Sequence, residues 1–345
     1  MTFADIITSQ AIAAYWTVRA NERKPFFGES KFPAKKKLGL NLAWIKGARK
    51  SPVRLNLSAF DAKVLPLNRG KVTKLSTNMP FFKNSMVIDE EQRQELNKLI
   101  GSTANQQLID IVVNDVFNDQ MHLIEDAEVT MEILRMQALT TGVVSVADNG
   151  QSYSFDYGVP NENKVTPSVL WTNENADPIA DITKYCDQIE NTTGVRPTEG
   201  VMNNITLGYL TKVNAIKNAI YVMANGTVTP SRSKVLEYLQ TETGVTFYIN
   251  SKVYKALDGT STKFVADGTV VLMPATTLGN TWFGTTPEES DLMSRATDAN
   301  VSIVDTGVAI TTMIEKDPVN VVTKASMICL PSFELAEQII IATVK

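Results

Sequence analysis

The chain has 345 residues, of which 43% are hydrophobic and 20% are charged. This length and composition predict a folded protein with one large or two medium-sized domains, and they exclude a chain that is disordered throughout. No run of 18 apolar residues occurs, which excludes a membrane-spanning helix. The two cysteines, Cys186 and Cys329, lie far apart and outside any Cys-x-x-Cys motif, so we expect buried thiols and neither a disulfide framework nor a zinc site.

Charge is distributed unevenly along the chain. Residues 1–87 carry 16 Lys and Arg against 4 Asp and Glu, a net charge of +12, whereas residues 88–345 carry 17 against 33, a net charge of −16. Such asymmetry indicates binding to nucleic acid, a membrane or a protein partner, with a solvated basic face as the alternative. The acidic remainder argues against free sequence-specific DNA binding, since DNA-binding domains are usually basic.

The basic part of the chain predicts an arm followed by a hairpin. Residues 19–37 mix charge, proline and glycine without a period and predict an irregular arm. Residues 38–44 and 53–57 alternate between apolar and polar side chains, and the turn-like residues 46–52 join them. An isolated two-stranded hairpin is marginally stable in water, so we expect this one to pack on the rest of the chain or on another chain.

Two helices are predicted next. Three consecutive acidic residues from Asp89 favour a helix N-terminus, and Gly101 interrupts that helix. A longer helix is predicted over about 104–139. Its apolar stripe consists of Ile109, Val113, Val116, Ala127, Met131, Leu134 and Ala138. With 1.5 Å per residue, 36 residues would span about 54 Å, so this helix is expected to act as a strut.

The second half of the chain predicts a mixture of helices and strands. After Gly142, residues 143–147 and 153–157 predict a hairpin across Asn149-Gly150. Residues 176–257 alternate between helix and strand, as in a small α/β arrangement. Residues 278–287 are rich in glycine and are interpreted as a tight turn. The end of the chain predicts three strand segments, at 308–313, 319–328 and 338–344.

Motifs that carry enzyme chemistry are not found in the sequence. The single histidine, His122, has no nucleophile or metal ligand at a functional spacing, so a surface or interface position is expected. Phosphate-binding, nucleophile-elbow and zinc-protease motifs do not occur. The acidic groups Asp177/Asp181 and Glu125/Asp126/Glu128 could be paired acids and bases, but solvated helix faces are the favoured interpretation. We therefore predict no catalytic residue, no metal and no cofactor; an α/β enzyme with an unrecognised site is the disfavoured alternative.

Three stretches carry a resemblance to a known family. They are Glu132–Val143 at the end of the long helix, Asp267–Pro274 followed by Leu278–Glu288, and Leu330–Phe333 continuing to Ile339–Val344. Together with the order of elements, they resemble the major capsid proteins of tailed bacteriophages, specifically the lambda-type capsid protein E family. The resemblance implies the Hong Kong 97-like fold, an α+β fold with an N-terminal arm, an extended hairpin loop and a long spine helix.

The resemblance also implies a domain organisation. Residues 1–28 would form the N-terminal arm and 29–86 the extended loop, which would lie over a neighbouring subunit. Residues 87–165, with the spine helix at about 104–140, and 308–345, with the closing strands, would form the peripheral domain. Residues 166–307 would form the axial domain.

The function that the resemblance implies is self-assembly, as hexamers and pentamers, into an icosahedral shell enclosing double-stranded DNA. DNA would be packaged without sequence-specific binding, and a portal and a separate scaffolding protein would be partners. The shell would assemble in the host cytoplasm and become the virion capsid. Two alternatives stay open: an encapsulin-like compartment shell, and a nucleic-acid-binding protein with a basic N-terminal region.

The charge asymmetry predicts which residues meet between subunits. Attraction between the basic loop of one copy and an acidic surface of the next would neutralise both. The candidate contact residues are Lys35, Lys36, Lys37, Arg49, Lys50 and Arg54 on the basic side and Glu125, Asp126 and Glu128 on the acidic side.

Overall fold

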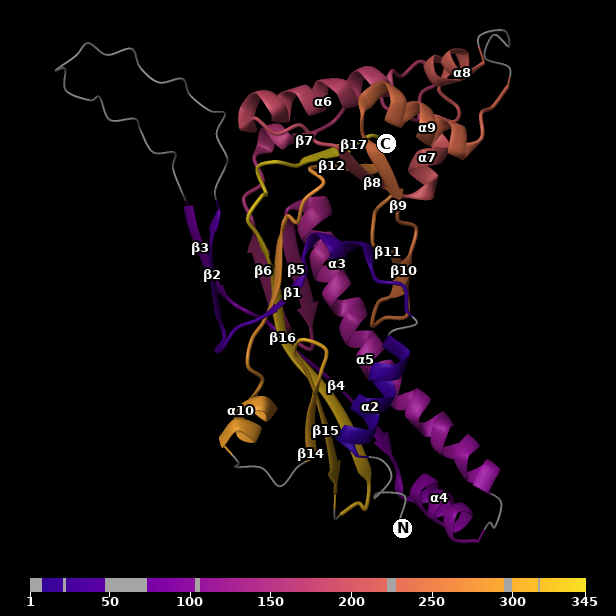
Figure 1. Ribbon diagram of the computed structural model, residues 1–345, viewed down its shortest axis with the longest axis vertical. Coiled ribbons are helices and arrows are strands. Elements are labelled where there is room, and N and C mark those ends of the chain that lie inside the picture. Colours follow the sequence, from indigo (N-terminus) through magenta and orange to yellow (C-terminus); the bar gives the residue numbers. More distant parts are fainter. Residues whose placement is uncertain are drawn as a thin grey trace, which may run out of the picture. The chain divides into compact units, whose positions relative to one another are not determined.

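The computed structural model describes residues 8–20, 23–46, 73–102, 106–221, 228–294, 300–315 and 317–345 (Figure 1). The chain divides into two compact units. The first comprises Met1–Leu42, Ser76–Leu134 and Asn280–Ser332, and the second comprises Ala43–Leu75, Arg135–Gly279 and Phe333–Lys345. Each unit is assembled from stretches that lie far apart in the sequence. The arm, loop, peripheral and axial boundaries implied by the resemblance stay a prediction.

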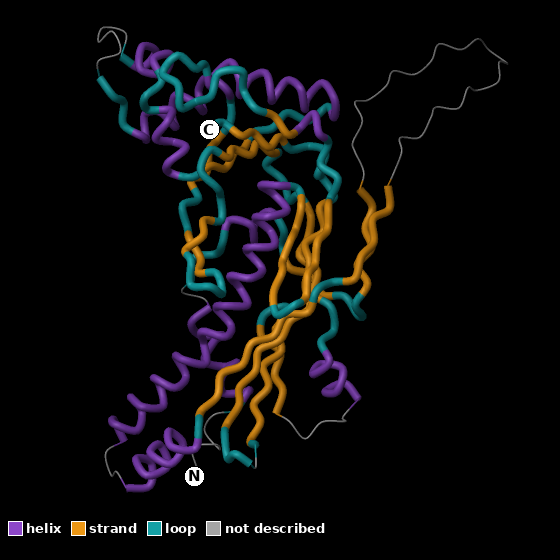
Figure 2. Tube along the Cα trace, turned by 180° about the vertical axis from the view of Figure 1, so that it is seen from behind, coloured by secondary structure: helices purple, strands orange, loops and turns teal. Residues whose placement is uncertain are grey.

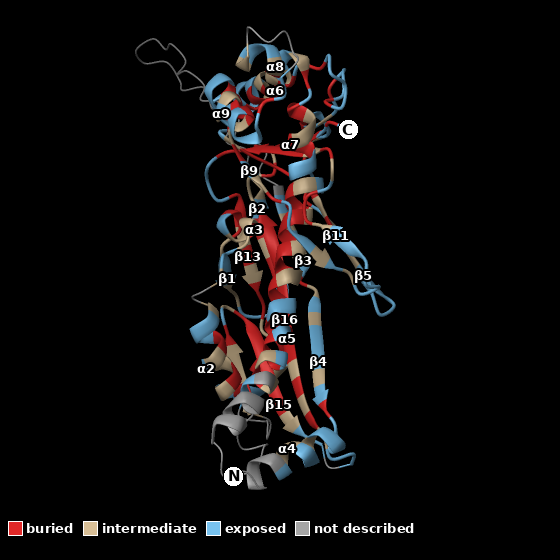
Figure 3. Ribbon diagram, turned by 90° about the vertical axis from the view of Figure 1, so that its right-hand side faces the viewer, coloured by how far each residue is buried: buried red, intermediate tan, exposed pale blue. Residues whose placement is uncertain are grey.

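A six-stranded sheet forms the framework of the first unit (Figure 2). Its order is β1-β13-β16-β15-β14, and β4 also pairs with β16. The strands are β1 (Ala34–Lys36), β4 (Phe81–Ile88), β13 (Gly279–Phe283), β14 (Asn300–Val304), β15 (Val308–Ile314) and β16 (Val321–Phe333). β16 pairs antiparallel with both β15 and β4. Figure 3 shows that buried residues run along β16, as expected for a central strand.

Four of the described helices accompany this sheet, and the first of them, α2 (Ser9–Ala20), packs on one of its faces. The others are α3 (Phe27–Lys31), α4 (Glu90–Ser102) and α5 (Gln106–Thr141). α2 contacts β14 and β15, and the Oγ of Ser9 donates to Oδ1 of Asn300 at 2.7 Å. Arg23 reaches Glu128 of α5 at 2.7 Å, and the backbone N–H of Gly28 donates to Glu132 of α5 at 2.9 Å. These buried polar contacts hold the segment around α3 against α5.

A five-stranded sheet with the order β7-β17-β12-β8-β9 forms the framework of the second unit. Its strands are β7 (Lys164–Val165), β8 (Glu199–Met202), β9 (Thr246–Ile249), β12 (Thr269–Met273) and β17 (Ile340–Thr343). Figure 1 shows the helices α6 (Pro178–Thr193), α7 (Asn204–Leu210), α8 (Asn214–Ile220) and α9 (Arg232–Thr243) over one face of this sheet. Ile189, Leu239, Leu272 and Ile340 are fully or almost fully buried between the two layers.

Short elements complete the described part of the chain. They are the 3-10 turn η1 (Asn161–Asn163), the helix α10 (Pro287–Ser294) and three two-stranded pairs: β2 (Asn41–Lys46) with β3 (Thr73–Asn78), β5 (Val143–Asp148) with β6 (Gln151–Asp156), and β10 (Val253–Lys255) with β11 (Ser261–Lys263). At the β5–β6 turn, Asn149 and Gly150 both have positive φ, as a tight hairpin turn requires.

Elements with strong local signals are confirmed. The long helix is α5, and it ends before Gly142, whose φ is +76°. The predicted 143–157 hairpin is β5–β6, and the three C-terminal strand segments overlap β15, β16 and β17, of which β16 runs five residues beyond the predicted end. The helix expected from Asp177 is α6, where the Asp177 side chain accepts from the N–H of Ala180. Both cysteines are buried.

The prediction of an irregular arm over 19–37 is wrong in part. This segment contains α3 and β1, and β1 pairs parallel with β13. Because β13 lies far from β1 in the sequence, no local period predicts this pairing. The predicted hairpin strand 53–57 and its turn lie outside the described residues. The first strand of that hairpin overlaps β2, which pairs with β3.

The tight turn predicted over 278–287 is also wrong, because Gly279–Phe283 is the strand β13. β4 and β14 were not predicted as strands at all. Gly284 follows β13 where the backbone is crowded: a Cβ atom there would lie 2.7 Å from the carbonyl oxygen of Gly39 and 2.9 Å from Cγ2 of Ile328. Glycine at this position serves close packing and not a turn.

The apolar stripe of α5 is confirmed over its second half. Ala127, Met131, Leu134 and Ala138 are buried, whereas Val116 is only half-buried and the side chains of Ile109 and Val113 lie outside the described set. In the first half, Phe117, Met121 and Ile124 face inward instead. The register of the buried face therefore differs from the predicted one near Val116.

Replacing Ile124 with Asp is expected to destabilise the protein by about 3 kcal/mol or more, because Ile124 is completely buried and the carboxylate would have no partner. Val116→Asp is the matched control. It should cost about 1 kcal/mol, because half of that side chain reaches solvent. Denaturant unfolding measures both values, and equal losses would contradict the register described above.

Replacing Gly284 with Ala should lower the free energy of unfolding by about 1–3 kcal/mol, since the added methyl group overlaps backbone and side-chain atoms. The same change at Gly208, inside α7, meets no atom closer than 3.9 Å and should be stabilising by up to about 1 kcal/mol. Opposite signs in thermal unfolding are the expected result. A Gly284→Ala variant as stable as the wild type would show that the space around Gly284 can accommodate a methyl group.

Candidate assembly surface

The described basic residues of the predicted contact set lie on and after β1. Lys36 donates to Glu289 of α10 at 2.6 Å and to the carbonyl of Gly284 at 3.1 Å. Lys35 is exposed, and its Nζ lies 5.8 Å from the centroid of the Trp282 ring. Lys37 is half-exposed. Lys36 therefore pairs with a carboxylate of its own chain, while the ammonium groups of Lys35 and Lys37 face solvent. Arg49, Lys50 and Arg54 lie outside the described residues.

The acidic residues of the set do not form one surface. Glu125 and Asp126 are exposed on α5, and Glu125 contacts the ring of His122 at 3.0 Å. Partial burial raises the pKa of Asp126, although the charge of His122 and a hydrogen bond from Asn84 oppose this. Glu128 faces inward, is 5% exposed and pairs with Arg23. Glu128 thus stabilises the subunit itself.

The sheet of the first unit has a second face that the helices α2 and α5 do not cover. On β14, Ser302 contacts Ser9 of α2, so the adjacent Val301 points to the opposite side. Val301, Thr311 and Lys324 lie opposite one another across β14, β15 and β16, and Ser85 of β4 continues this row. We call this side the outer face. Its residues on β4 include Phe81 and Val87, which are 42% and 48% exposed.

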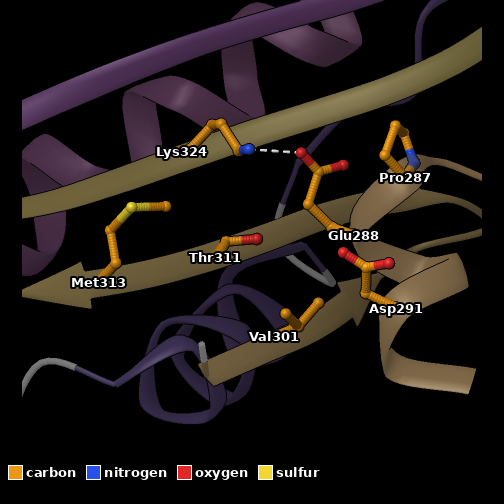
Figure 4. A pocket seen from close by; sticks show the side chains of 7 residues that line it. All are labelled: Pro287, Glu288, Asp291, Val301, Thr311, Met313 and Lys324. Atoms are coloured by element: carbon orange, nitrogen blue, oxygen red, sulfur yellow. Dashed lines mark hydrogen bonds and ion pairs between the residues drawn. The ribbon is translucent and has the colours of Figure 1, made fainter. Parts of the chain in front are cut away.

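A pocket of about 190 Å³ lies on the outer face beside α10 (Figure 4). We call it the α10 pocket. Its residues are Pro287, Glu288 and Asp291 from α10, Val301 from β14, Thr311 and Met313 from β15, and Lys324 from β16. α10 contacts both β14 and β15, which fixes its acidic side chains at the pocket edge.

Glu288 and Lys324 form an ion pair across the pocket, and the Oγ of Ser326 donates to the same carboxylate at 2.9 Å. Burial alone would raise the pKa of Glu288. The hydrogen bonds from Lys324, the Glu288 backbone and Ser326 and the charge of Lys324 outweigh burial, so the pKa lies below its ordinary value. Glu288 therefore stays ionised, and the pair is neutral as a whole.

No prediction from the sequence covers this site, although part of it has a local signal. Thr286-Pro287-Glu288-Glu289 has the pattern of a helix start, and Oγ1 of Thr286 accepts from the N–H of Glu289 at 3.2 Å. That signal predicts α10 but not its neighbours. The contacts of α10 with β14 and β15 and the Lys36–Glu289 pair depend on strand pairings that no local pattern reveals.

The other acidic group considered for catalysis has structural roles. Asp177 caps α6, and Asp181 accepts from Nε1 of Trp171 at 2.9 Å. Within the described ranges, no three His, Cys, Asp or Glu side chains are placed to hold a metal ion. None of the helices described is both long and apolar enough to cross a membrane.

Glu288→Gln removes one charge from the pocket pair and is expected to lower the free energy of unfolding at pH 7 by about 1–2 kcal/mol. Because the pKa of Glu288 is lower in the folded state, its stabilisation is present above the ordinary value of 4.5 and is lost as pH falls below it. Urea unfolding of both proteins between pH 7 and pH 3 should show the difference shrinking in acid. A difference that stays constant would mean that ionisation of Glu288 plays no part.

Comparisons with known proteins agree with this architecture. The family model described as phage major capsid protein E matches residues 8–344. A putative capsid protein of a prophage from Escherichia coli CFT073 is 15% identical, with a TM-score of 0.59 over 98% of this chain and 99% of that one. A phage-related protein from Bordetella bronchiseptica RB50 is 11% identical, with a TM-score of 0.58 over 97% and 96%.

A chain from the capsid asymmetric unit of cyanophage A-1(L) is 12% identical, with a TM-score of 0.52 over 93% and 92%. No curated protein matches. At these identities the solved structures show the fold, and the family match over nearly the whole chain shows the family. The chain has the Hong Kong 97-like fold and belongs to the phage major capsid protein E family, whose members are structural subunits of bacteriophage capsids.

Proposed function

We propose that the chain self-assembles, as hexamers and pentamers, into an icosahedral shell that encloses double-stranded DNA in the head of a tailed bacteriophage. The observation that carries this proposal is the family match, which covers residues 8–344 and so nearly the whole chain. The outer face supports it physically: an isolated subunit leaves Phe81 and Val87 nearly half-exposed, and burial against another copy would remove this apolar surface from water.

The proposal includes partners other than the chain itself. The shell assembles in the host cytoplasm, with a portal and a separate scaffolding protein, and becomes part of the virion. DNA is enclosed without sequence-specific recognition. The net charge of −16 over residues 88–345 supports this, since an acidic surface repels phosphate and tight DNA binding requires a basic one.

Contacts between subunits are proposed to join basic and acidic surfaces of different copies. Lys35 and Lys37 are available on the described basic side, together with Arg49, Lys50 and Arg54 of the proposed loop. Glu125 and Asp126 are available on the acidic side. Lys36 and Glu128 contribute less, because each is paired within its own chain. The family match favours neither the encapsulin-like compartment nor the free nucleic-acid-binding protein.

Replacing Lys35 and Lys37 with Glu should weaken assembly, because attraction between copies becomes repulsion. Added salt should restore part of the assembly, since exposed charges are screened over about 8–10 Å. Light scattering across a salt series measures association, and DNA binding is measured on the same samples.

The control for this experiment is Lys212→Glu with Lys255→Glu, which reverses the charge of two exposed lysines in the second unit. This variant should assemble normally. Unchanged assembly of the Lys35/Lys37 variant with abolished DNA affinity would contradict the proposal and favour a nucleic-acid-binding function.

A further inference from the structure

We infer that the α10 pocket receives a single lysine or arginine side chain from a second copy of this chain. The inference rests on the proposed function, because it requires that copies associate. The charge pattern alone does not identify this contact. Its acidic residues lie on α10, at the outer face of the sheet, in addition to those on α5.

The size of the pocket selects the class of ligand. Sites for small molecules and cofactors usually have volumes of about 300–1,000 Å³. The α10 pocket has about 190 Å³ and is open on one side, so it accommodates one long side chain and not a cofactor. Val301, Met313 and Pro287 provide apolar walls along which the methylene groups of a lysine or arginine can pack.

The charge of the pocket selects a cation. Lys324 neutralises Glu288, but the carboxylate of Asp291 has no hydrogen bond or ion pair with any residue that the structure describes. Among the described residues, the pocket therefore carries one negative charge without a partner, beside a neutral pair. An ammonium or guanidinium group between Asp291 and Glu288 would be attracted by both carboxylates, whereas a phosphate or a carboxylate would be repelled.

The buried hydroxyl of Thr311 is an independent sign that a polar ligand belongs here. Thr311 is 2% exposed and lines the pocket, and its Oγ1 has no hydrogen-bond partner within the described chain. Figure 4 shows this oxygen directed toward the side of the pocket where Glu288 and Asp291 lie. A buried hydroxyl without a partner is unfavourable, and a cationic N–H donor entering the pocket would satisfy it.

The source of the cation follows from the charge distribution of the chain. Residues 1–87 carry a net charge of +12 and residues 88–345 a net charge of −16. Each copy therefore has basic groups that can pair with acidic groups of another copy, and acidic groups that can pair with basic ones. Copies of one chain in a shell can satisfy both needs at once through a repeated contact between different surfaces. A second copy is therefore the occupant that the sequence supplies.

Two substitutions separate binding from folding. Thr311→Val removes the hydroxyl with little change in shape, so the isolated subunit should be at least as stable as the wild type. Assembly should nevertheless weaken, because the incoming cation loses an acceptor. Asp291→Asn removes the unpaired charge and should raise the protein concentration needed for assembly about tenfold, as expected for the loss of a charged hydrogen bond.

Each substitution has a matched control. Thr323 of β16 is 1% exposed and its Oγ1 also has no partner among described residues, but it points to the other side of the sheet from Lys324 and does not line the pocket. Thr323→Val should match Thr311→Val in stability and should assemble like the wild type. Asp258→Asn removes an exposed carboxylate from the β10–β11 turn in the second unit and should also assemble normally.

The experiment measures light scattering of the purified full chain over a concentration series, with urea unfolding of the same samples. We expect Thr311→Val and Asp291→Asn to fold normally and to assemble only at higher concentration, while both controls follow the wild type. If the wild type assembles and the two pocket variants assemble equally well, the inference is overturned and the proposed function stands. If phage particles built from the pocket variants have normal shells but lack a different phage protein, the occupant is that protein and the inference is also overturned. A wild-type chain that never associates, alone or with the proposed scaffolding protein, overturns the proposed function and this inference together.

Discussion

The antiparallel pairing of β16 with β4 on one side and β15 on the other is the constraint on which the first unit depends. It joins a segment near residue 85 to the C-terminal part of the chain, and it aligns Ser85, Lys324, Thr311 and Val301 in one row. Because neighbouring residues of a strand point to opposite faces, this register also decides which side chains face inward. A shift by one residue would exchange the buried and outer sets.

The two faces of this sheet have different roles. α2 and α5 cover the inner face, and the contacts of Arg23 and Gly28 with α5 hold the N-terminal segment in place. On the outer face, α10 packs against β14 and β15 at one end, and apolar residues of β4 stay exposed. A subunit that buries its exposed apolar surface only on association with other copies is what a capsid protein requires.

Local chemistry made most individual elements predictable. Asp177 caps a helix, Gly142 ends one, and Asn149-Gly150 forms a hairpin turn, so the sequence near each of them carries the necessary signal. The sequence does not predict β1, β4 and β13, because their stability comes from partners far along the chain. In β4, the consecutive polar residues Lys83, Asn84 and Ser85 also interrupt the apolar alternation that would indicate a strand. The candidate contact residues show the same limit. Only the fold reveals that Lys36 and Glu128 are paired internally and that Glu288, Asp291 and Thr311 share a pocket.

Electron cryomicroscopy of particles formed by the chain expressed alone tests the central claim most directly. The account predicts closed shells in which the outer face of each subunit is covered by a neighbouring copy and the density in the α10 pocket continues into a basic side chain of that copy. Shells in which the outer face and the pocket beside Asp291 are open to solvent at every symmetry position would contradict it.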